Sequence, residues 1–199
     1  MIRWETLLWF TSYILVSVGL SAFGAHKVKV LYGYWKLRKQ RPVASGQFAE
    51  LPKVTIQLPI FNEADVMDPL IAAIGTLDYP KEKLQIQFLD DSTDETTQIC
   101  EAHAQNLRLA GFDVEYRHRQ NRRGFKAGAM EDGMATVKGE FICIFDADFT
   151  PEPDYLKRTI HYFTDPQIGI VQARWGHRNR TFSLLTRLQA ILLDGHLML

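Results

Sequence analysis

The chain has 199 residues, of which 46% are hydrophobic and 23% are charged. These values are typical of a folded globular protein, and the length fits one domain with a small appendage. The 23 basic and 23 acidic residues cancel, which argues against nucleic acid as a partner, because such binding needs a basic face. The 2 cysteines and 6 scattered histidines exclude a disulfide framework and a zinc site with the usual ligand spacing.

The amino-terminal stretch Thr6–Ala25 contains 20 residues without a charge. As a helix it would rise about 30 Å, enough to cross the hydrocarbon core of a bilayer. Only Arg3, offset by Glu5, precedes it, whereas several basic residues follow it: Lys27, Lys29, Lys36, Arg38, Lys39 and Arg41. By the positive-inside bias, we predict one transmembrane anchor within residues 1–26 and a cytoplasmic location for the rest of the chain.

A cleaved signal peptide is the alternative, since Ala22-Phe23-Gly24 resembles a small-x-small cleavage site. The apolar run is long for a signal peptide and its basic flank is on the wrong side, so we favour an anchor. The basic stretch that follows fits either an amphipathic helix on the membrane surface or a continuation of the anchor helix. Residues 27–51 are therefore predicted to be a basic juxtamembrane segment and a linker rich in turn-forming residues.

From residue 52 onward, strand and helix patterns alternate. Strands are expected at 54–60, 84–89, 114–117, 141–145 and 168–173, and helices near 63–77, 94–109, 126–137, 151–163 and 182–193. Asn62 can cap the first of these helices, and capping of the second by Ser92 or Thr93 is the alternative to a binding role for the residues after the second strand. The alternation predicts an α/β domain with a mainly parallel sheet over residues 52–199, incomplete at its apolar carboxyl end.

One strand end carries two acids. The strand at 141–145 is expected to be buried on both faces, and it runs directly into Asp146 and Asp148. In an extended segment these two side chains project to the same side, where their carboxylates would form a hard-oxygen site for Mg²⁺ or Mn²⁺. Such ions commonly hold nucleotide phosphates, and open α/β sheets place ligands at these strand ends. The alternative is that both acids are solvated loop or capping residues.

Two further strand ends extend this pattern. The first strand runs into Pro59–Glu63, and the second ends at Asp90 and Asp91, where a carboxylate could accept hydrogen bonds from a base or a ribose. The segment Asn121–Ala129 combines cations and glycines with the start of a helix, which suits a phosphate group. Each feature alone fits capping or a solvated turn about as well, whereas the ordered series indicates a binding site.

The chain resembles glycosyltransferase family 2 in four motifs that follow in order: Phe61-Asn62-Glu63, Asp90-Asp91-Ser92-Thr93-Asp94, Lys126-Ala127-Gly128-Ala129 and Asp146-Ala147-Asp148. Longer matches at Phe145–Asp154 and Val171–Trp175 are similar to the processive cellulose-synthase-like branch, which makes mannan and glucan backbones. The resemblance implies a GT-A-like (Rossmann-like) fold that binds a nucleotide-diphosphate sugar. It also implies inverting, metal-dependent transfer of a hexose from GDP-mannose or UDP-glucose to a growing β-glycan.

The resemblance further implies roles for individual residues. Asp146 and Asp148 would hold Mg²⁺ or Mn²⁺ on the diphosphate, so that its charge is neutralised as the bond to the sugar breaks. The expected partners are a nucleotide-sugar donor, a polysaccharide acceptor and the membrane. Contacts to the donor nucleotide are expected from Pro59, Asn62, Glu63, Asp90, Asp91, Lys126 and Asp146.

Two motifs of the family are missing. The catalytic base of a Thr-Glu-Asp motif is absent, and Gln172-Ala173-Arg174-Trp175 is one residue too short for the family's Gln-x-x-Arg-Trp motif. Both motifs are expected beyond Leu199, so residues 1–199 are predicted to bind the donor without transferring sugar. Two alternatives stay open: a membrane-tethered nucleotide-binding or partner-binding module without catalysis, and a haloacid-dehalogenase-like phosphatase in which Asp146 attacks phosphorus.

Overall fold

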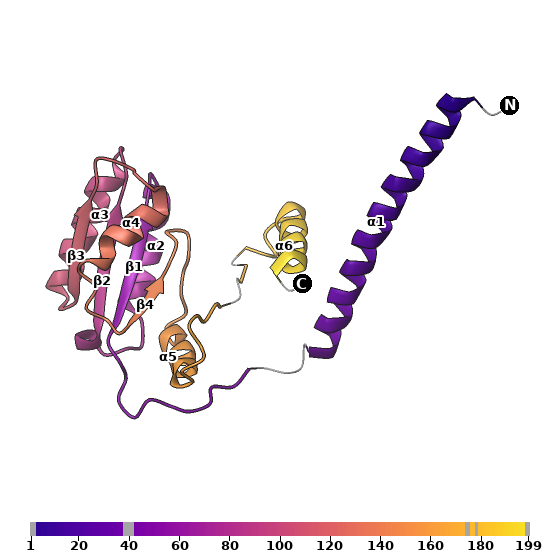
Figure 1. The fold of residues 1–199 in the computed structure, drawn as a ribbon. Helices are drawn as coiled ribbons and strands as arrows, with labels where there is room; N and C mark the ends of the chain where they lie inside the picture. Colours follow the sequence, from indigo (N-terminus) through magenta and orange to yellow (C-terminus); the bar gives the residue numbers. More distant parts are fainter. Residues whose placement is uncertain (1–2, 38–41, 174–175, 178, 198–199) are drawn as a thin grey trace. The chain divides into compact units, whose positions relative to one another are not determined.

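A computed structural model of the chain describes residues 3–37, 42–173, 176–177 and 179–197. The chain divides into one unit of Ala44–Val171 and another that combines Met1–Val43 with Gln172–Leu199. The first is an α/β unit (Figure 1), and the second contains the helices α1 (Trp4–Leu37) and α6 (Leu184–Leu197). Of the residues discussed above, those outside the described ranges include Arg38, Lys39, Arg41, Arg174 and Trp175.

The amino-terminal helix α1 contains 34 residues. Within the described ranges it is the one helix that is long and apolar enough to cross a membrane. At 1.5 Å per residue it is about 51 Å long, which exceeds the roughly 30 Å of a hydrocarbon core. The helix runs without a break through Lys27 and Lys36, so the basic stretch continues the apolar helix instead of forming a separate one.

The α/β unit is built on a parallel sheet of four strands in the order β3-β2-β1-β4. The strands are β1 (Val54–Ile60), β2 (Leu84–Asp90), β3 (Asp113–His118) and β4 (Phe141–Ile144). The strand order reverses beside β1, because the chain adds β2 and β3 on one side of it and β4 on the other. Such a switch point is where parallel α/β sheets bind ligands, at the carboxyl ends of the strands.

Helices cover both faces of the sheet, with α2 and α3 on one face and α4 on the other (Figure 1). The face under α2 and α3 is apolar, and strand residues such as Ile56, Leu58 and Phe88 are completely buried there against the helices. The helices of this unit are α2 (Ala64–Gly75), α3 (Thr96–Leu109), α4 (Phe125–Met134) and α5 (Tyr155–Ile160), with short 3-10 helices at Lys81–Lys83 and His161–Thr164.

The face under α4 is polar, although it is also buried. Thr55 and Gln57 of β1 lie in register beside Gln85 and Gln87 of β2. The Thr55 hydroxyl donates to Gln85 Oε1 (2.7 Å), and the Gln57 amide donates to Gln87 Oε1 (3.0 Å). The Gln87 amide in turn donates to the carbonyl oxygen of Gly133 in α4 (3.0 Å). Directional hydrogen bonds, and not only apolar burial, therefore fix how α4 sits on the sheet.

The predicted α/β domain with a parallel sheet, preceded by one long apolar helix, is confirmed, but two strands differ from the prediction. Residues 168–173 form no strand, and Ile170 is 86% exposed. The strand predicted to be buried on both faces is β4, which in the described part of the chain pairs with β1 alone. Its Ile142 and Ile144 are 37% and 49% exposed, because α4 covers β1 and β2 and leaves this side of β4 open.

Asn62, Ser92 and Thr93, the candidate capping residues, do not cap these helices. The residue before α2 is Glu63 and the residue before α3 is Glu95, and neither of these two side chains makes a capping hydrogen bond. At the start of α3 it is the Asp94 side chain that accepts a hydrogen bond from the first backbone N–H of the helix, that of Thr96 (3.0 Å). Asn62, Ser92 and Thr93 bond to one another instead, as described below. The remaining predicted helices are present, and α4 ends at Met134, a few residues earlier than predicted.

Replacing Gln87 with Leu should lower the free energy of unfolding by about 1–3 kcal/mol, because the buried Gln57 amide and Gly133 carbonyl lose their partner. Gln120→Leu makes the same chemical change at an exposed position and should shift stability by less than about 0.5 kcal/mol. Urea unfolding of the detergent-solubilised chain, followed by near-ultraviolet circular dichroism, measures both variants. Equal effects would show that the polar face contributes nothing specific to stability.

Candidate functional site

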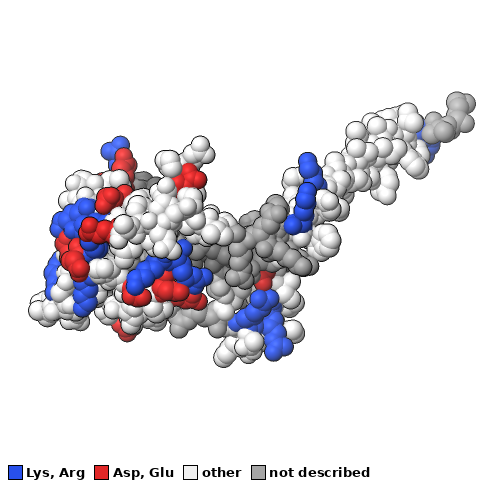
Figure 2. Space-filling model, turned by 90° about the horizontal axis from the view of Figure 1, so that it is seen from below, with Lys and Arg blue, Asp and Glu red and all other residues white. Residues whose placement is uncertain are grey.

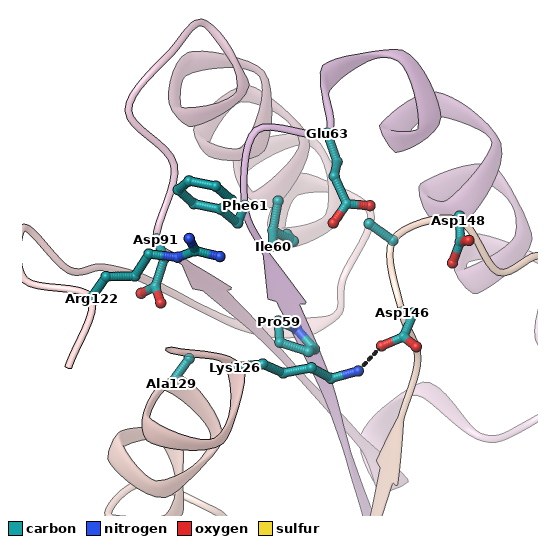
Figure 3. A pocket seen from close by; sticks show the side chains of 11 residues that line it. Pro59, Ile60, Phe61, Glu63, Asp91, Arg122, Lys126, Ala129, Asp146 and Asp148 are labelled. Atoms are coloured by element: carbon teal, nitrogen blue, oxygen red, sulfur yellow. Dashed lines mark hydrogen bonds and ion pairs between the residues drawn. The ribbon is translucent and has the colours of Figure 1, made fainter. Parts of the chain in front are cut away.

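A pocket of about 320 Å³ lies at the switch point of the sheet, at the carboxyl ends of β1 and β4 (Figure 3). Its residues come from the ends of β1 and β2, the start of α4 with the loop before it, and the turn after β4. Six of the eight predicted site residues line the pocket, and Asn62 and Asp90 do not. The lining consists of Pro59, Ile60, Phe61, Glu63, Asp91, Arg122, Lys126, Ala129, Asp146, Ala147 and Asp148.

Asp90 ends β2 and is completely buried. One of its carboxylate oxygens accepts a hydrogen bond from the Ser92 amide (2.9 Å), and the other accepts one from the Tyr116 hydroxyl (2.9 Å) and lies 3.0 Å from His118 Nδ1. Burial raises the pKa of the Asp90 carboxyl, but the hydrogen bonds from Ser92, Tyr116 and His118 outweigh it and hold the pKa below its ordinary value. Asp90 thus ties the loop after β2 to β3.

Asp91, the next residue, lines the pocket and is paired with Arg119. Arg119 Nε donates to Asp91 Oδ1 (2.7 Å) and Nη2 donates to Oδ2 (2.6 Å), and the two side chains are only 10% and 4% exposed, respectively. The same guanidinium donates to Asp132 in α4 (2.8 Å), to the carbonyl oxygen of Phe125 where α4 begins (3.1 Å) and to the carbonyl oxygen of Arg123 in the loop before it (3.4 Å). The bonds to Asp91, with those to Asp132, raise the pKa of Arg119. This cation therefore joins β2, the loop before α4 and α4 itself.

The backbone is unusual where the loop before α4 meets the first residue of the helix. Gly124 and Phe125 both have positive φ angles, 73° and 51°. Glycine adopts this region freely, whereas for Phe125 it is strained. The loop also packs so closely on α4 that a Cβ atom at Gly128 would overlap the carbonyl oxygen of Arg123. This tight turn places the cations on either side of it at the pocket.

Arg122 lies at the mouth of the pocket and stacks on an aromatic ring (Figure 3). Its guanidinium carbon is 3.1 Å from the centroid of the Phe61 ring and 5.3 Å from that of Phe125. Such cation–π contacts are attractive and hold both groups in place. Phe61 and Arg122 thus form a flat surface on the side of the pocket where Asp91 lies (Figure 3).

The opposite side of the pocket is acidic (Figure 3). Strand β4 ends at Ile144, so Asp146 and Asp148 lie in the turn that follows and not in an extended segment as predicted. Both nevertheless line the pocket, and Lys126 donates a hydrogen bond to Asp146. The pKa of Glu63 is raised, first by its burial and then by the negative charges of Asp148 and Asp146, while Lys126 opposes the rise.

Asn62 connects the loops that follow β1 and β2. Its φ angle is 53°, and its backbone N–H donates to the Ser92 hydroxyl (3.0 Å). Its side-chain oxygen accepts a hydrogen bond from the Thr93 backbone N–H (2.9 Å). These bonds hold the loops that carry Glu63 and Asp91 next to each other at the edge of the pocket.

Sequence reasoning missed the basic and aromatic partners of the acids, above all Arg119 and Tyr116. A signal for Arg119 is present, because it directly follows the third predicted strand and the ends of parallel strands meet at one edge. Arg122 lies within the basic stretch that the sequence indicated, but its stacking on Phe61 has no sequence signal.

Residues 55–196 match the family model described as glycosyl transferase family 2. The chain belongs to this family. It is similar to two plant proteins, the probable glucomannan 4-beta-mannosyltransferase 7 of Oryza sativa subsp. japonica (40% identical over 190 residues) and glucomannan 4-beta-mannosyltransferase 2 of Arabidopsis thaliana (42% over 170 residues). The matches cover 91% and 83% of this chain but only 31% of each plant protein, so this family 2 glycosyltransferase spans about a third of their length.

A solved structure shares the fold. The mannosyltransferase PcManGT from Pyrobaculum calidifontis, in complex with GDP-Man and Mn2+, matches with a TM-score of 0.69 and 27% identity, covering 82% of this chain and 48% of that one. The predicted family and the GT-A-like fold are therefore confirmed. The family match includes Asp146 and leaves the phosphatase alternative without support.

Replacing Asp90 with Asn should lower stability most at neutral pH. Because the pKa of Asp90 in the folded chain lies below the unfolded value of about 3.9, its ionised form contributes stability that is present above the unfolded pKa and lost as the pH falls through the folded pKa. The difference between the native chain and the variant should therefore be largest above about pH 5 and shrink in acid. Urea unfolding at several pH values between neutral and acid measures this difference in stability, and Glu131→Gln, at an exposed position, is the control. A difference that is constant with pH would contradict this role.

Proposed function

We propose that this family 2 glycosyltransferase binds a nucleotide-diphosphate sugar in the pocket, and that the donor is GDP-mannose. The observation that carries the proposal is the pocket itself, which collects two cations and four acids, among them the pair Asp146 and Asp148, from separate segments at the switch point. Guanine and mannose are favoured over UDP-glucose because both plant relatives are named mannosyltransferases and PcManGT is in complex with GDP-Man.

The nucleoside occupies the side of the pocket that holds Asp91. A base stacks against the flat Phe61–Arg122 surface, since aromatic and guanidinium planes both favour such contacts. The Asp91 carboxylate, held in place by Arg119, accepts hydrogen bonds from the N–H groups of the base. Asp90 and Asn62, which bond within the protein, act by positioning this surface.

The diphosphate lies between α4 and the acidic side. The first turn of α4 presents backbone N–H groups and the positive end of the helix dipole, which suit phosphate oxygens. Lys126 in the same turn adds a full positive charge. Sugar transfer breaks the bond between the anomeric carbon and the diphosphate, so charge grows on the diphosphate in the transition state. Lys126 therefore stabilises the transition state more than the bound donor.

Asp146 and Asp148 would hold Mn²⁺ or Mg²⁺. In the described part of the chain, no three His, Cys, Asp or Glu side chains are close enough to hold an ion by themselves. This fits ions of this type, which bind through one or two carboxylates and complete their shell with substrate phosphates. After burial, the negative charges of Asp148 and Asp146 are what raise the pKa of Glu63, so the site favours a cation. When bound, such an ion neutralises the leaving diphosphate.

The activity of the whole protein follows as a further proposal, because the chain spans about a third of its plant relatives. It is inverting transfer of mannose to a growing β-glycan, with the catalytic base outside residues 1–199. Helix α1 serves as a single membrane anchor and places the α/β unit in the cytoplasm. The charges at its two ends support this orientation: Arg3 is paired with Glu5 (3.0 Å), whereas uncompensated lysines follow the apolar stretch.

Calorimetry of the detergent-solubilised chain with GDP and UDP, each with and without Mn²⁺, tests the donor site. We expect GDP to bind more tightly than UDP and Mn²⁺ to strengthen binding. Asp148→Asn should weaken the metal-dependent binding about tenfold or more, because a charge-assisted contact contributes roughly 1.5–3 kcal/mol. Glu152→Gln, at an exposed acid in the same loop, is the matched control. Absence of binding by a chain with a folded circular-dichroism spectrum would overturn the proposal.

Phe61→Ala should weaken the binding of guanosine, GMP and GDP by a similar factor of about five. Loss of one stacking partner of the base costs about 1 kcal/mol of binding free energy, and this cost does not depend on the number of phosphates in the ligand. Phe125→Ala is the matched control, since Phe125 also lies near Arg122 but does not line the pocket. The same calorimetry measures both. Equal losses in the two variants would place the base elsewhere.

A further inference from the structure

The zero net charge of the chain hides a strong asymmetry. Six of the 23 basic residues, and none of the 23 acidic ones, lie in the segment from Lys27 to Arg41. No acidic residue occurs between Glu5 and Glu50, and the rest of the chain holds 17 basic against 23 acidic residues. A basic segment directly after the apolar stretch is therefore balanced by an acidic remainder.

Three of these cations, Lys27, Lys29 and Lys36, belong to α1, and we call them the basic collar. All three are exposed. Lys29 and Lys36 are seven residues apart, nearly two turns, and lie on one side of the helix, whereas Lys27 lies on the opposite side. The Lys27 ammonium is 5.6 Å from the centroid of the Phe23 ring, at the end of the uncharged stretch. The collar thus places cations on two opposite sides of the helix where its apolar part ends.

Aromatic residues accompany the collar. Tyr32, Tyr34 and Trp35 fall between its lysines, and at 100° per residue they too point to different sides of α1. Tyr and Trp favour the boundary between bilayer and water. Because Lys27 stands opposite Lys29 and Lys36, this part of the helix does not divide into one polar and one apolar face, as a helix that lies flat on a membrane does. The arrangement fits an upright helix that passes through the headgroup layer at this level.

We propose that the basic collar binds the phosphate groups of acidic phospholipids in the leaflet from which α1 emerges. Basic clusters directly beyond a membrane-spanning helix attract anionic headgroups within about a Debye length. The other end of α1 lacks this property, because Arg3 is paired with Glu5 (3.0 Å). The inference rests on the membrane insertion of α1 that the proposed function includes.

The visible face of the α/β unit shows no separate basic patch that would compete with the collar for acidic lipids (Figure 2). On its visible face, basic and acidic side chains are interspersed (Figure 2). Several of its lysines are paired with acids, among them Lys53 and Lys138, which both reach Asp113 (3.7 and 2.8 Å). With the acidic excess outside the segment from Lys27 to Arg41, an anionic membrane attracts the collar and repels this unit.

Electron spin resonance of the full chain in dioleoylphosphatidylcholine vesicles tests the proposal, with traces of spin-labelled phosphatidylglycerol or phosphatidylcholine as probes. The motionally restricted fraction of each probe reports its preference for the protein. We expect the native chain to prefer phosphatidylglycerol by about threefold, and 1 M salt to reduce this preference. The variant Lys27→Gln/Lys29→Gln/Lys36→Gln should show a much smaller preference. The matched control, Lys53→Gln/Lys81→Gln/Lys138→Gln in the α/β unit, should keep it.

The outcomes separate this inference from the proposed function. Flotation of the chain with the vesicles reports insertion, and a chain that does not float overturns both the anchor and the collar. A chain that floats but binds both probes equally overturns the collar alone. Loss of the preference in the control variant as well would assign the lipid attraction to the α/β unit and not to the collar.

Discussion

The buried pairing of Arg119 with Asp91 is the contact on which the pocket depends. A guanidinium that binds a carboxylate through two parallel hydrogen bonds fixes the orientation of both groups. The remaining donors of Arg119 reach Asp132 and the carbonyl oxygens of Arg123 and Phe125, so one side chain sets the end of β2, the loop before α4 and α4 relative to one another. Leaving Asp91 buried without this partner would cost several kcal/mol, roughly 3–5 by analogy with other buried pairs.

The two faces of the sheet have different tasks. The apolar face under α2 and α3 supplies most of the burial that stabilises the unit. The polar face binds α4 through Gln57, Gln87 and their neighbours, and bonds of this kind are satisfied in only one orientation of the helix. Because Lys126 lies in the first turn of α4, the glutamines beneath the helix determine where that cation stands relative to Asp146.

The sequence predicts much of this fold, because hydrophobic periodicity reports strands and helices and the ends of parallel strands converge at one edge. It does not tell which of two adjacent acids faces a ligand. Asp90 and Asp91 are equivalent in the sequence, and only their hydrogen bonds in the structure tell them apart. Asp90 accepts one from Tyr116 and has a structural role, whereas Asp91 accepts one from Arg119 and lines the pocket. Hydrophobic periodicity also does not report whether a helix covers a given strand, so it could not predict that one side of β4 is open.

The separation of charge between the basic segment from Lys27 to Arg41 and the acidic remainder of the chain affects how the protein behaves in solution. At pH 7 the formal net charge is zero. Copies of the chain therefore lack the net electrostatic repulsion that keeps charged proteins apart in solution. The basic segment of one copy and the acidic unit of another attract each other instead. Such attraction between unlike ends is screened by ions. Ionic strength, more than a small change of pH, should therefore govern the colloidal stability of the purified protein.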